Sequence, residues 1–468
     1  MFRMNKTIAV LLAASCLTAC SIGPDYDEPI ASASANAPFI GVQSAEVTSE
    51  APSENWWRLY DDPVLNALVE DTLAANTDVR VAVARIARAR ASLRGARGEA
   101  LPQTAISASG SFGRVSESET LPGIDREGRR IAGEFAASYE IDLFGRVARG
   151  IEASRADLEA ARQDADAVRV MVVADTVQAY VDAAATAQQI AVAQSMLDLL
   201  TRSERITDAR YERGLNQRLD VLRLTQLREA QAATIPPLIA RRDAALFRLA
   251  TLTGRTPRDL PDAVRERATT PRVGQPIPVG DGQILLARRP DVKAAERRLA
   301  ADIARIGVAT ADLYPRISLG AAVSTTAVGN APIFGSGPLG WLVGPLISWA
   351  FPNQEAMRAR IEAARADAAA DLADFDGTVL RALEETETAL SAYQSALVSE
   401  DRLAASRDAA NRAAKVSLAR QSRGQIDTLA SLDAQRTLAE TEADYAAARR
   451  AVAIAQVNLF RALGGSWN

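Results

Sequence analysis

Apolar residues recur three and four positions apart along two very long stretches of the chain. This spacing places them on one helix face, and its persistence over many turns is typical of a coiled-coil seam. It predicts long helices over about residues 146–211 and 354–422. At about 1.5 Å of rise per residue, each would be a rod on the order of 100 Å long. The seam residues are Leu158, Ala161, Ala165, Val168, Val172, Ala179, Ala183, Ile190, Ala193, Leu197 and Leu200, and then Leu372, Phe375, Val379, Ala382, Leu390, Tyr393 and Leu397.

A different pattern, strict alternation, occupies the segment before each long helix. It predicts β-hairpins with about ten residues per strand, as in a membrane β-barrel, although a half-buried soluble hairpin would show the same period. Pro345 fits poorly in a strand with no free edge, so that strand either starts late or bends there. One face carries Phe135, Ala137, Tyr139, Ile141, Leu143, Ile317, Leu319, Ala321, Val323, Trp341, Val343, Ile347 and Trp349, and the other Glu134, Ser138, Glu140, Asp142, Ser318, Gly320 and Ser324.

The chain repeats itself. Residues 78–102 align on 291–315 at a shift of 213, and residues 210–254 align on 420–464 at a shift of 210. We therefore expect two copies of one plan, residues 62–254 and 284–465, joined by a Pro-rich connector at 255–283. Each copy has a moderate helix (about 62–98 or 284–313), a hairpin, the long helix and a last helix (about 218–253 or 427–463). Pro236 and Pro237 should kink or break the last helix of the first copy only.

Four strands cannot close a barrel in lipid, because an unpaired strand edge in hydrocarbon is too costly. Small membrane barrels need at least about 8 strands. Two hairpins per chain therefore require two or more chains, and three chains would give 12 strands. The same symmetry would gather the helices into a tube.

The first residues read as an export signal. Arg3 and Lys6 precede a short apolar run, Ile8 to Leu17, which is too short to span a bilayer. The run ends in Leu17-Thr18-Ala19-Cys20, which resembles a bacterial lipobox. We expect residues 1–19 to be a lipoprotein signal peptide, Cys20 to carry the lipid, and residues 20–61 to form a lipidated linker. An ordinary signal peptide is the alternative.

Composition narrows the functional class. The chain has no His, and its two Cys, at positions 16 and 20, lie in the export signal. A Ser-His-Asp triad, a His metal site and a disulfide framework are thus excluded, and we expect no enzyme, cofactor or metal. The net charge of −4 gives no signature of nucleic-acid binding.

Several motifs together resemble the outer membrane efflux proteins (TolC-like), in the lipoprotein branch that serves RND pumps. They are residues 20–26, Trp56-Trp57 to Leu65, residues 285–292 with Ala295 and Glu296, and Arg423-Gly424 to Arg436. The resemblance implies a mostly helical protomer with a membrane β-barrel part. It implies a homotrimer in the outer membrane, with a 12-stranded barrel continuous with a 12-helix periplasmic tunnel. It also implies a periplasmic adaptor (membrane fusion) protein and an inner-membrane RND pump as partners.

The resemblance also assigns roles to the turns that follow each long helix. Gly at such a turn is first a left-handed helix cap. The family adds contact with the adaptor's hairpin. Carried over by position, the adaptor-contacting tips are Arg213, Gly214, Leu215, Arg423, Gly424 and Gln425.

A tunnel gate is expected beyond the second tip. Asp433 and Arg436 could form an ordinary exposed ion pair. In the family reading, Asp433 from each protomer rings the narrow end of the tunnel, and Leu429 forms an apolar constriction. Asp220 and Arg223 are the candidates from the first copy. Family gates can carry a second acid where this chain has Ala430, so a double ring is in doubt. We interpret Glu384, Glu385 and Glu387 as a solvated helix face.

Three functions compete at this point. The first is a passive trimeric duct for small molecules such as drugs or toxic compounds. The second is the duct of an ABC-driven type I protein secretion system. The third is a periplasmic coiled-coil lipoprotein without a pore. The lipobox and the motif at 285–291 favour the first, and the two hairpins argue against the third. The exported compound is not encoded in any feature we identify.

Overall fold

The computed structural model describes residues 22–30, 32–41, 46–53, 55–116, 118, 126–329 and 331–464. The chain forms two compact units, each of which draws on both halves of the sequence. One unit contains residues 85–162 and 294–375 with the N-terminal residues up to 29, and the other contains residues 30–84, 163–293 and 376–468. In the described part of the chain, no helix combines the length and apolar character needed to cross a membrane.

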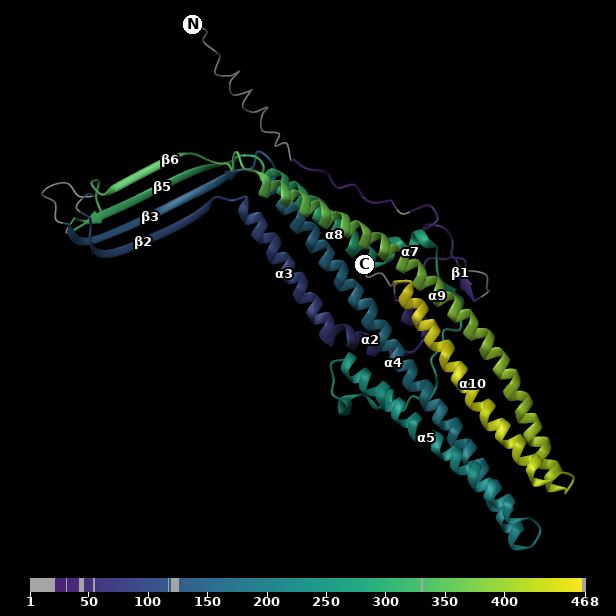
Figure 1. Ribbon diagram of the computed structural model, residues 1–468. Coiled ribbons are helices and arrows are strands. Elements are labelled where there is room, and N and C mark those ends of the chain that lie inside the picture. The colour runs from purple at the N-terminus through teal and green to yellow at the C-terminus, as the bar shows by residue number, and fades with distance from the viewer. Residues whose placement is uncertain are drawn as a thin grey trace. The chain divides into compact units, whose positions relative to one another are not determined.

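The same order of elements occurs twice (Figure 1). The first copy contains α2 (Pro63–Ala75), α3 (Thr77–Glu99), β2 (Gln103–Arg114), β3 (Glu127–Ile141), α4 (Arg146–Glu212) and α5 (Arg218–Leu252). The second contains α7 (Gly282–Arg288), α8 (Pro290–Ala311), β5 (Arg316–Val328), β6 (Leu339–Ser348), α9 (Glu355–Ser422) and α10 (Thr428–Ala462). Short elements complete the chain: β1 (Val47–Thr48), η1 (Trp56–Tyr60), η3 (Pro257–Asp259), α6 (Asp262–Arg265) and β4 (Ile277–Pro278).

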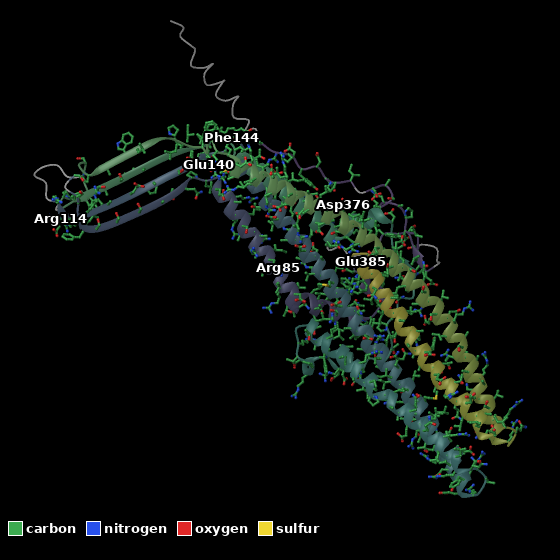
Figure 2. The ribbon with its side chains drawn as sticks, in the orientation of Figure 1. Arg85, Arg114, Glu140, Phe144, Asp376 and Glu385 are labelled. Atoms are coloured by element: carbon green, nitrogen blue, oxygen red, sulfur yellow. The ribbon has the colours of Figure 1, made fainter. Side chains whose placement is uncertain are left out.

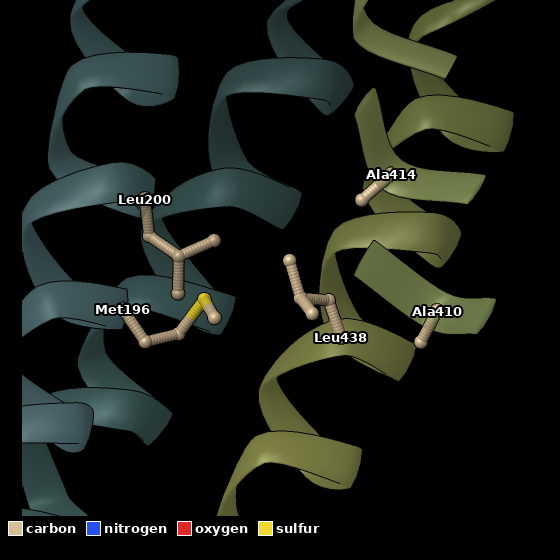
Figure 3. Packing of buried hydrophobic residues seen from close by; sticks show 5 residues of the cluster. All are labelled: Met196, Leu200, Ala410, Ala414 and Leu438. Carbon is tan, nitrogen blue, oxygen red and sulfur yellow. The ribbon is translucent and has the colours of Figure 1, made fainter. Parts of the chain in front are cut away.

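Helices α4 and α9 have 67 and 68 residues, so the long helices predicted from the apolar seam are confirmed. A buried cluster of Met196, Leu200, Ala410, Ala414 and Leu438 joins α4, α9 and α10 (Figure 3). Leu200 is completely buried there. Alanine supplies much of the contact surface, and its small side chain lets neighbouring helices approach closely.

The moderate helix predicted at the start of each copy is instead two helices. In the first copy Asn76 has extended backbone between α2 and α3. Its amide nitrogen donates a hydrogen bond to the carbonyl oxygen of Leu252 at 2.9 Å, which caps the end of α5. In the second copy Arg289 precedes Pro290, and a residue before proline is driven away from helical backbone.

Arg289 does in the second copy what Asn76 does in the first. Its guanidinium donates to the carbonyl oxygen of Ala462 at 3.1 Å, at the end of α10. Asn76 and Arg289 differ by 213 positions, which is the shift of the sequence repeat. The break in each first helix therefore has a structural purpose, because it brings a donor to the end of the last helix.

The two expectations about proline have different outcomes. Helix α5 runs from Arg218 to Leu252 with Pro236 and Pro237 in its interior, so the helix does not break there, and the kink stays a prediction. Strand β6 neither starts after Pro345 nor shifts its register there, because Pro345 pairs directly with Leu319 in an uninterrupted ladder. In the described residues of the single chain, β6 lies at one edge of its sheet.

The sheet of the first unit has the strand order β2-β3-β5-β6, and all its neighbours are antiparallel. The two hairpins predicted from alternation thus lie side by side (Figure 1). Leu143, expected in the first hairpin, lies just beyond the end of β3. The hairpin tips run from residue 115 to 126 and from 329 to 338, and residues 117, 119–125 and 330 lie outside the described part.

The N-terminal segment lies along both units. In the first unit, the backbone nitrogen of Ile22 donates to the oxygen of Phe144 at 3.3 Å, and Arg149 binds Asp25 at 2.6 Å. A Cβ atom on Gly23 would lie 2.6 Å from the Cα atom of Gly307, so this contact requires glycine. In the second unit, Trp56 stacks on Phe460 at 4.7 Å.

Candidate functional site

The two turns predicted as adaptor-contacting tips have the same backbone geometry. Gly214 has φ +73° and Gly424 has φ +71°, which is the left-handed region that glycine adopts without strain. The residue after each glycine donates to a carbonyl five residues back: Leu215 to Arg210 and Gln425 to Arg420, both at 2.9 Å. These bonds form the Schellman cap expected at such a turn.

The helices that return from the two tips begin differently. In the first copy the Asp220 carboxylate accepts from the backbone nitrogen of Gln217 at 3.3 Å, so the acid lies within the first turn. In the second copy Asp427 is the cap residue, and its carboxylate accepts from the nitrogen of Ala430 at 2.9 Å. The capping acid thus stands three residues after the cap position in the first copy and at the cap position itself in the second. Asp220 therefore has a local structural task, and Ala430 occupies the aligned position in the second copy.

A cleft of about 740 Å³ lies between the two tips, within the second unit. It brings together Gly214, Leu215, Asp220, Arg223, Gly424 and Leu429 from the predicted tip and gate residues. Predicted residues Arg213, Arg423, Gln425, Asp433 and Arg436 do not line it. Residues that the sequence did not single out complete the lining: Arg210, Asn216, Gln217, Gln421, Ser422, Ile426 and Asp427.

Asp433 and Arg436 form an ion pair on the surface of α10. The distance from Arg436 Nη2 to Asp433 Oδ1 is 2.9 Å, and Arg436 also lies 3.8 Å from Glu440. The side chains of Asp433 and Arg436 are 66% and 58% exposed. Such a pair contributes little to stability, because water screens both charges.

Two members of the acidic cluster on α9 have partners within the protomer: Glu385 stays more than half exposed, as expected of a solvated face, whereas Glu387 is half-buried. Glu385 binds Arg289 at 2.7 Å. Glu387 accepts hydrogen bonds from the backbone nitrogens of Ile40 and Gly41 at 2.6 and 3.1 Å. Glu385 therefore helps to hold the segment around Arg289 in place, and Glu387 helps to hold the N-terminal segment. The sequence pattern misses this role, because the partners lie far away in the chain.

The sheet has one apolar and one polar face, as the ladder registers show. The polar face carries serine and charged residues, and Val328, Leu342 and Leu346 are its large apolar exceptions. On the apolar face the side chains are largely exposed. A wide exposed apolar surface of this kind fits lipid rather than water. The apolar face carries Ile106, Phe112, Ile131, Phe135, Tyr139, Ile141, Ile317, Leu319, Val323, Trp341, Val343 and Ile347.

Aromatic side chains gather where the strands meet the helices. Phe144 stacks on Tyr314 at 4.6 Å between ring centres, and Trp349 stacks on Phe351 at 4.7 Å. The indole nitrogen of Trp349 donates to the oxygen of Leu313 at 3.0 Å. Figure 2 shows Phe144 and Glu140 at this end of the sheet and Arg114 at the other. Aromatic belts of this type mark the boundary between lipid and water.

Two further predictions concern metal binding and the lipid anchor. Among the described residues no group of three or more acidic, His or Cys side chains could hold a metal ion. Cys20, predicted to carry the lipid, lies outside the described residues, as does the signal segment 1–19.

Comparison with known proteins agrees with this geometry. The profile of the outer membrane efflux protein family matches residues 68–255 and 282–465. Outer membrane protein OprJ of Pseudomonas aeruginosa is 30% identical, over 98% of this chain and 96% of its own length. The probable efflux pump outer membrane protein TtgC of Pseudomonas putida is 29% identical, over 99% and 96%. The solved outer-membrane channel OprN is 36% identical with a TM-score of 0.89, over 96% of this chain and 100% of its own.

The chain belongs to the outer membrane efflux protein family, and the resemblance to TolC-like proteins is confirmed. It is the channel component of an efflux system in the outer membrane, with its helices in the periplasm. The mostly helical fold class with a strand part is confirmed as well. A periplasmic lipoprotein without a pore is therefore no longer a candidate.

Proposed function

We propose that this protein is a passive trimeric duct that receives small molecules from an RND-type pump through a periplasmic adaptor. Three copies of the four-stranded sheet would close a 12-stranded barrel, and the helices would continue it as a 12-helix tunnel. The duct supplies no energy and no catalysis, and its cofactor content is limited to the lipid on Cys20. Residues 62–254 and 284–465 form its two repeats on either side of the connector.

The observation that carries this proposal is the sheet itself. Its four strands expose an apolar face, and β2 and β6 have no second strand partner among the described residues. Such edges are unstable in lipid unless other copies cover them. The relatives support the cargo class, since their names include antibiotic, toluene and solvent efflux pump proteins of Pseudomonas putida.

The cleft between the tips is the proposed docking site for the adaptor. Its lining combines the apolar Leu215 and Leu429 with charges of both signs, Arg210, Arg223, Asp220 and Asp427. Leu215 is 70% exposed and Leu429 is 48% exposed, so both are available to a partner. The tips are therefore suited to receive the hairpin of an adaptor.

An export assay tests this function. The chain would be expressed with its genomic adaptor and RND pump in cells that lack their own outer membrane channels. We expect lower accumulation of a fluorescent pump substrate than in cells that contain adaptor and pump alone. Leu215→Glu should abolish this difference without reducing the amount of protein in the outer membrane. Glu442→Ala, on α10 away from the tips, is the matched control.

The proposal fails if accumulation does not change when the chain is present and inserted. Restoration of export by an ABC transporter and its adaptor, but not by the RND pair, would instead identify a type I secretion duct.

A further inference from the structure

A groove of about 900 Å³, separate from the cleft between the tips, lies within the second unit. Helices α4, α9 and α10 line it, together with the junction between α7 and α8. Its volume is that of a site for a drug-sized molecule. Much of its lining is apolar and includes Val170, Met171, Ala389, Ala392, Ala396 and Ile454.

The charged residues of the groove are three acids and three arginines, and four of the six have partners within the protomer. The guanidinium of Arg289 binds Asp291 and Glu385, both at 2.7 Å. Arg450 binds Asp182 of α4. These four charges of the groove are therefore already neutralised.

The other two charges are Glu384 of α9 and Arg461 of α10, and both are exposed. Neither side chain forms an ion pair or hydrogen bond with any residue in the described ranges. The hydroxyl of Thr386 donates to the carbonyl oxygen of Ala462 at 3.4 Å, so these two positions are level on the antiparallel helices. Counted from there at about 1.5 Å per residue, Glu384 and Arg461 differ in height by about 4–5 Å. One end of the groove thus presents an acid and a cation that no other residue neutralises.

The groove becomes apolar in the direction of the tips. Thr388 and Asn458 come first and supply a hydroxyl and an amide. Ala392, Ala396 and Ile454 follow, at heights about 10–18 Å from the charged end of their own helices. The groove is therefore amphipathic along its length, with both free charges at the same end.

This groove lies on the side of α10 that the peripheral segments leave uncovered. Gln456 binds the connector, because its amide nitrogen donates to the carbonyl oxygen of Val273 at 3.2 Å. Phe460 stacks on Trp56. At about 100° per residue, Asn458 in the groove lies on the face of α10 opposite Gln456 and Phe460.

The uncovered side has a defined place in the proposed duct. The connector and the N-terminal segment belong outside a tube of helices, since inside it they would occupy the path. The groove, on the opposite face, then lies on the inner wall, where passing molecules meet it.

We propose that this groove is a weak binding site for amphipathic zwitterions, which are small molecules with an apolar body and, at one end, both an anionic and a cationic group. Arg461 binds the anionic group, Glu384 binds the cationic group, and the apolar body lies along Ala392, Ala396 and Ile454. A site on a path must release what it binds, and a solvated charge pair gives such modest affinity. This site rests on the trimeric duct proposed above.

Four fluorescent probes that share the dansyl group test the site. Dansyl-lysine carries both charges at one end, dansylglycine only the carboxylate, dansylcadaverine only the ammonium, and dansylamide neither. The protein would be reconstituted in lipid nanodiscs and shown to be trimeric by native mass spectrometry, with empty nanodiscs as the correction for probe in lipid. We expect saturable binding, with dansyl-lysine bound on the order of tenfold more tightly than dansylamide, because charge-assisted hydrogen bonds add to the apolar contact.

Substitution of each charge by an amide should affect different probes. Arg461→Gln should weaken dansyl-lysine and dansylglycine and leave dansylcadaverine unchanged. Glu384→Gln should weaken dansyl-lysine and dansylcadaverine and leave dansylglycine unchanged. Arg449→Gln on α10 and Asp401→Asn on α9 are the matched controls, since they remove charges of the same sign outside the groove.

The apolar stretch has its own variant. Ala392 is exposed in the groove, so Ala392→Phe fills space there without crowding the core. It should weaken all four probes, whereas each charge variant weakens only two. Circular dichroism verifies that each variant is folded.

Folded trimers that bind all four probes equally, or that bind them unchanged in both charge variants, overturn the site. Conductance of the same preparation in planar bilayers reports the duct separately, so the duct can survive this result. Binding by the monomer that disappears in the trimer also overturns the site, because a neighbouring copy then covers the groove. A protein that never forms trimers overturns the duct and, with it, the place of the groove on a path.

Discussion

At the scale of single residues, Asp433 has two possible roles: a surface ion pair with Arg436, or part of a tunnel gate. The structure shows its exposed ion pair with Arg436, in which the two side chains are 2.9 Å apart. The gate reading adds that three such carboxylates face one another across the tunnel, where they would attract divalent cations. The two interpretations differ in the effect that they predict for substitution of Asp433 or Arg436. Only the gate interpretation predicts a change in channel conductance and in block by divalent cations.

Removing the carboxylate and removing its partner should therefore have opposite effects. Asp433→Ala should raise the conductance of the closed channel and reduce block by divalent cations, because the acidic ring is lost. Arg436→Ala should strengthen the block, because it frees Asp433 from its neutralising partner. Single-channel recording with added divalent cation measures both. Glu442→Ala, nine residues further along and on the opposite face of α10, is the control. Unchanged conductance and block in both Asp433→Ala and Arg436→Ala would reduce the motif to a surface ion pair.

Residue roles were the hardest features to predict from the sequence. The cap glycines were predictable, because a turn after a helix imposes a local backbone requirement that one residue type meets. The contacts of Asn76, Arg289 and Glu387 were not predictable, because each of these residues binds a partner that is distant in the sequence. The separation is 176 residues for Asn76, 173 for Arg289 and 347 for Glu387. Only the repeat shift of 213 between Asn76 and Arg289 offered a signal.

At the scale of elements, the turns at the ends of the long helices carry the most specific backbone requirement. Both glycines have positive φ, and a Cβ atom on either would meet nothing within 4 Å. Any cost of substitution there comes from the backbone conformation rather than from crowding. This makes the two positions a clean test of the tip geometry.

Gly424→Ala should lower the free energy of unfolding by about 1–2 kcal/mol, since left-handed backbone is strained for alanine. Gly150→Ala is the matched control: Gly150 lies inside α4, a Cβ atom there also has open space, and alanine favours a helix by about 1 kcal/mol. Thermal unfolding followed by circular dichroism compares the two. A Gly424→Ala variant as stable as Gly150→Ala would contradict the left-handed cap.

Element identity was largely predictable, but the division of the first helix of each copy into two was not. The seam of apolar residues predicted α4 and α9 to within a residue or two, because a long period repeated many times is a strong signal. The breaks at Asn76 and Arg289 escaped prediction, since their cause is the end of another helix. Pro236 and Pro237 predicted a kink or a break, and the structure excludes the break, because α5 continues through both exposed prolines.

At the scale of the whole molecule, the account depends on several copies acting together. One chain supplies four strands with two open edges, an apolar face and a cleft between two helical tips. The sequence predicted the need for further copies from strand number alone. It could not predict which strands are the open edges, because the order β2-β3-β5-β6 is known only from the structure.

The most direct test of the duct is electrical. The purified protein in planar lipid bilayers should insert as trimers and produce uniform conductance steps, because a closed barrel of one size surrounds one path for ions. Native mass spectrometry of the same preparation would establish that the trimer is present. Folded, membrane-inserted trimers that never conduct, with or without adaptor, would contradict the account.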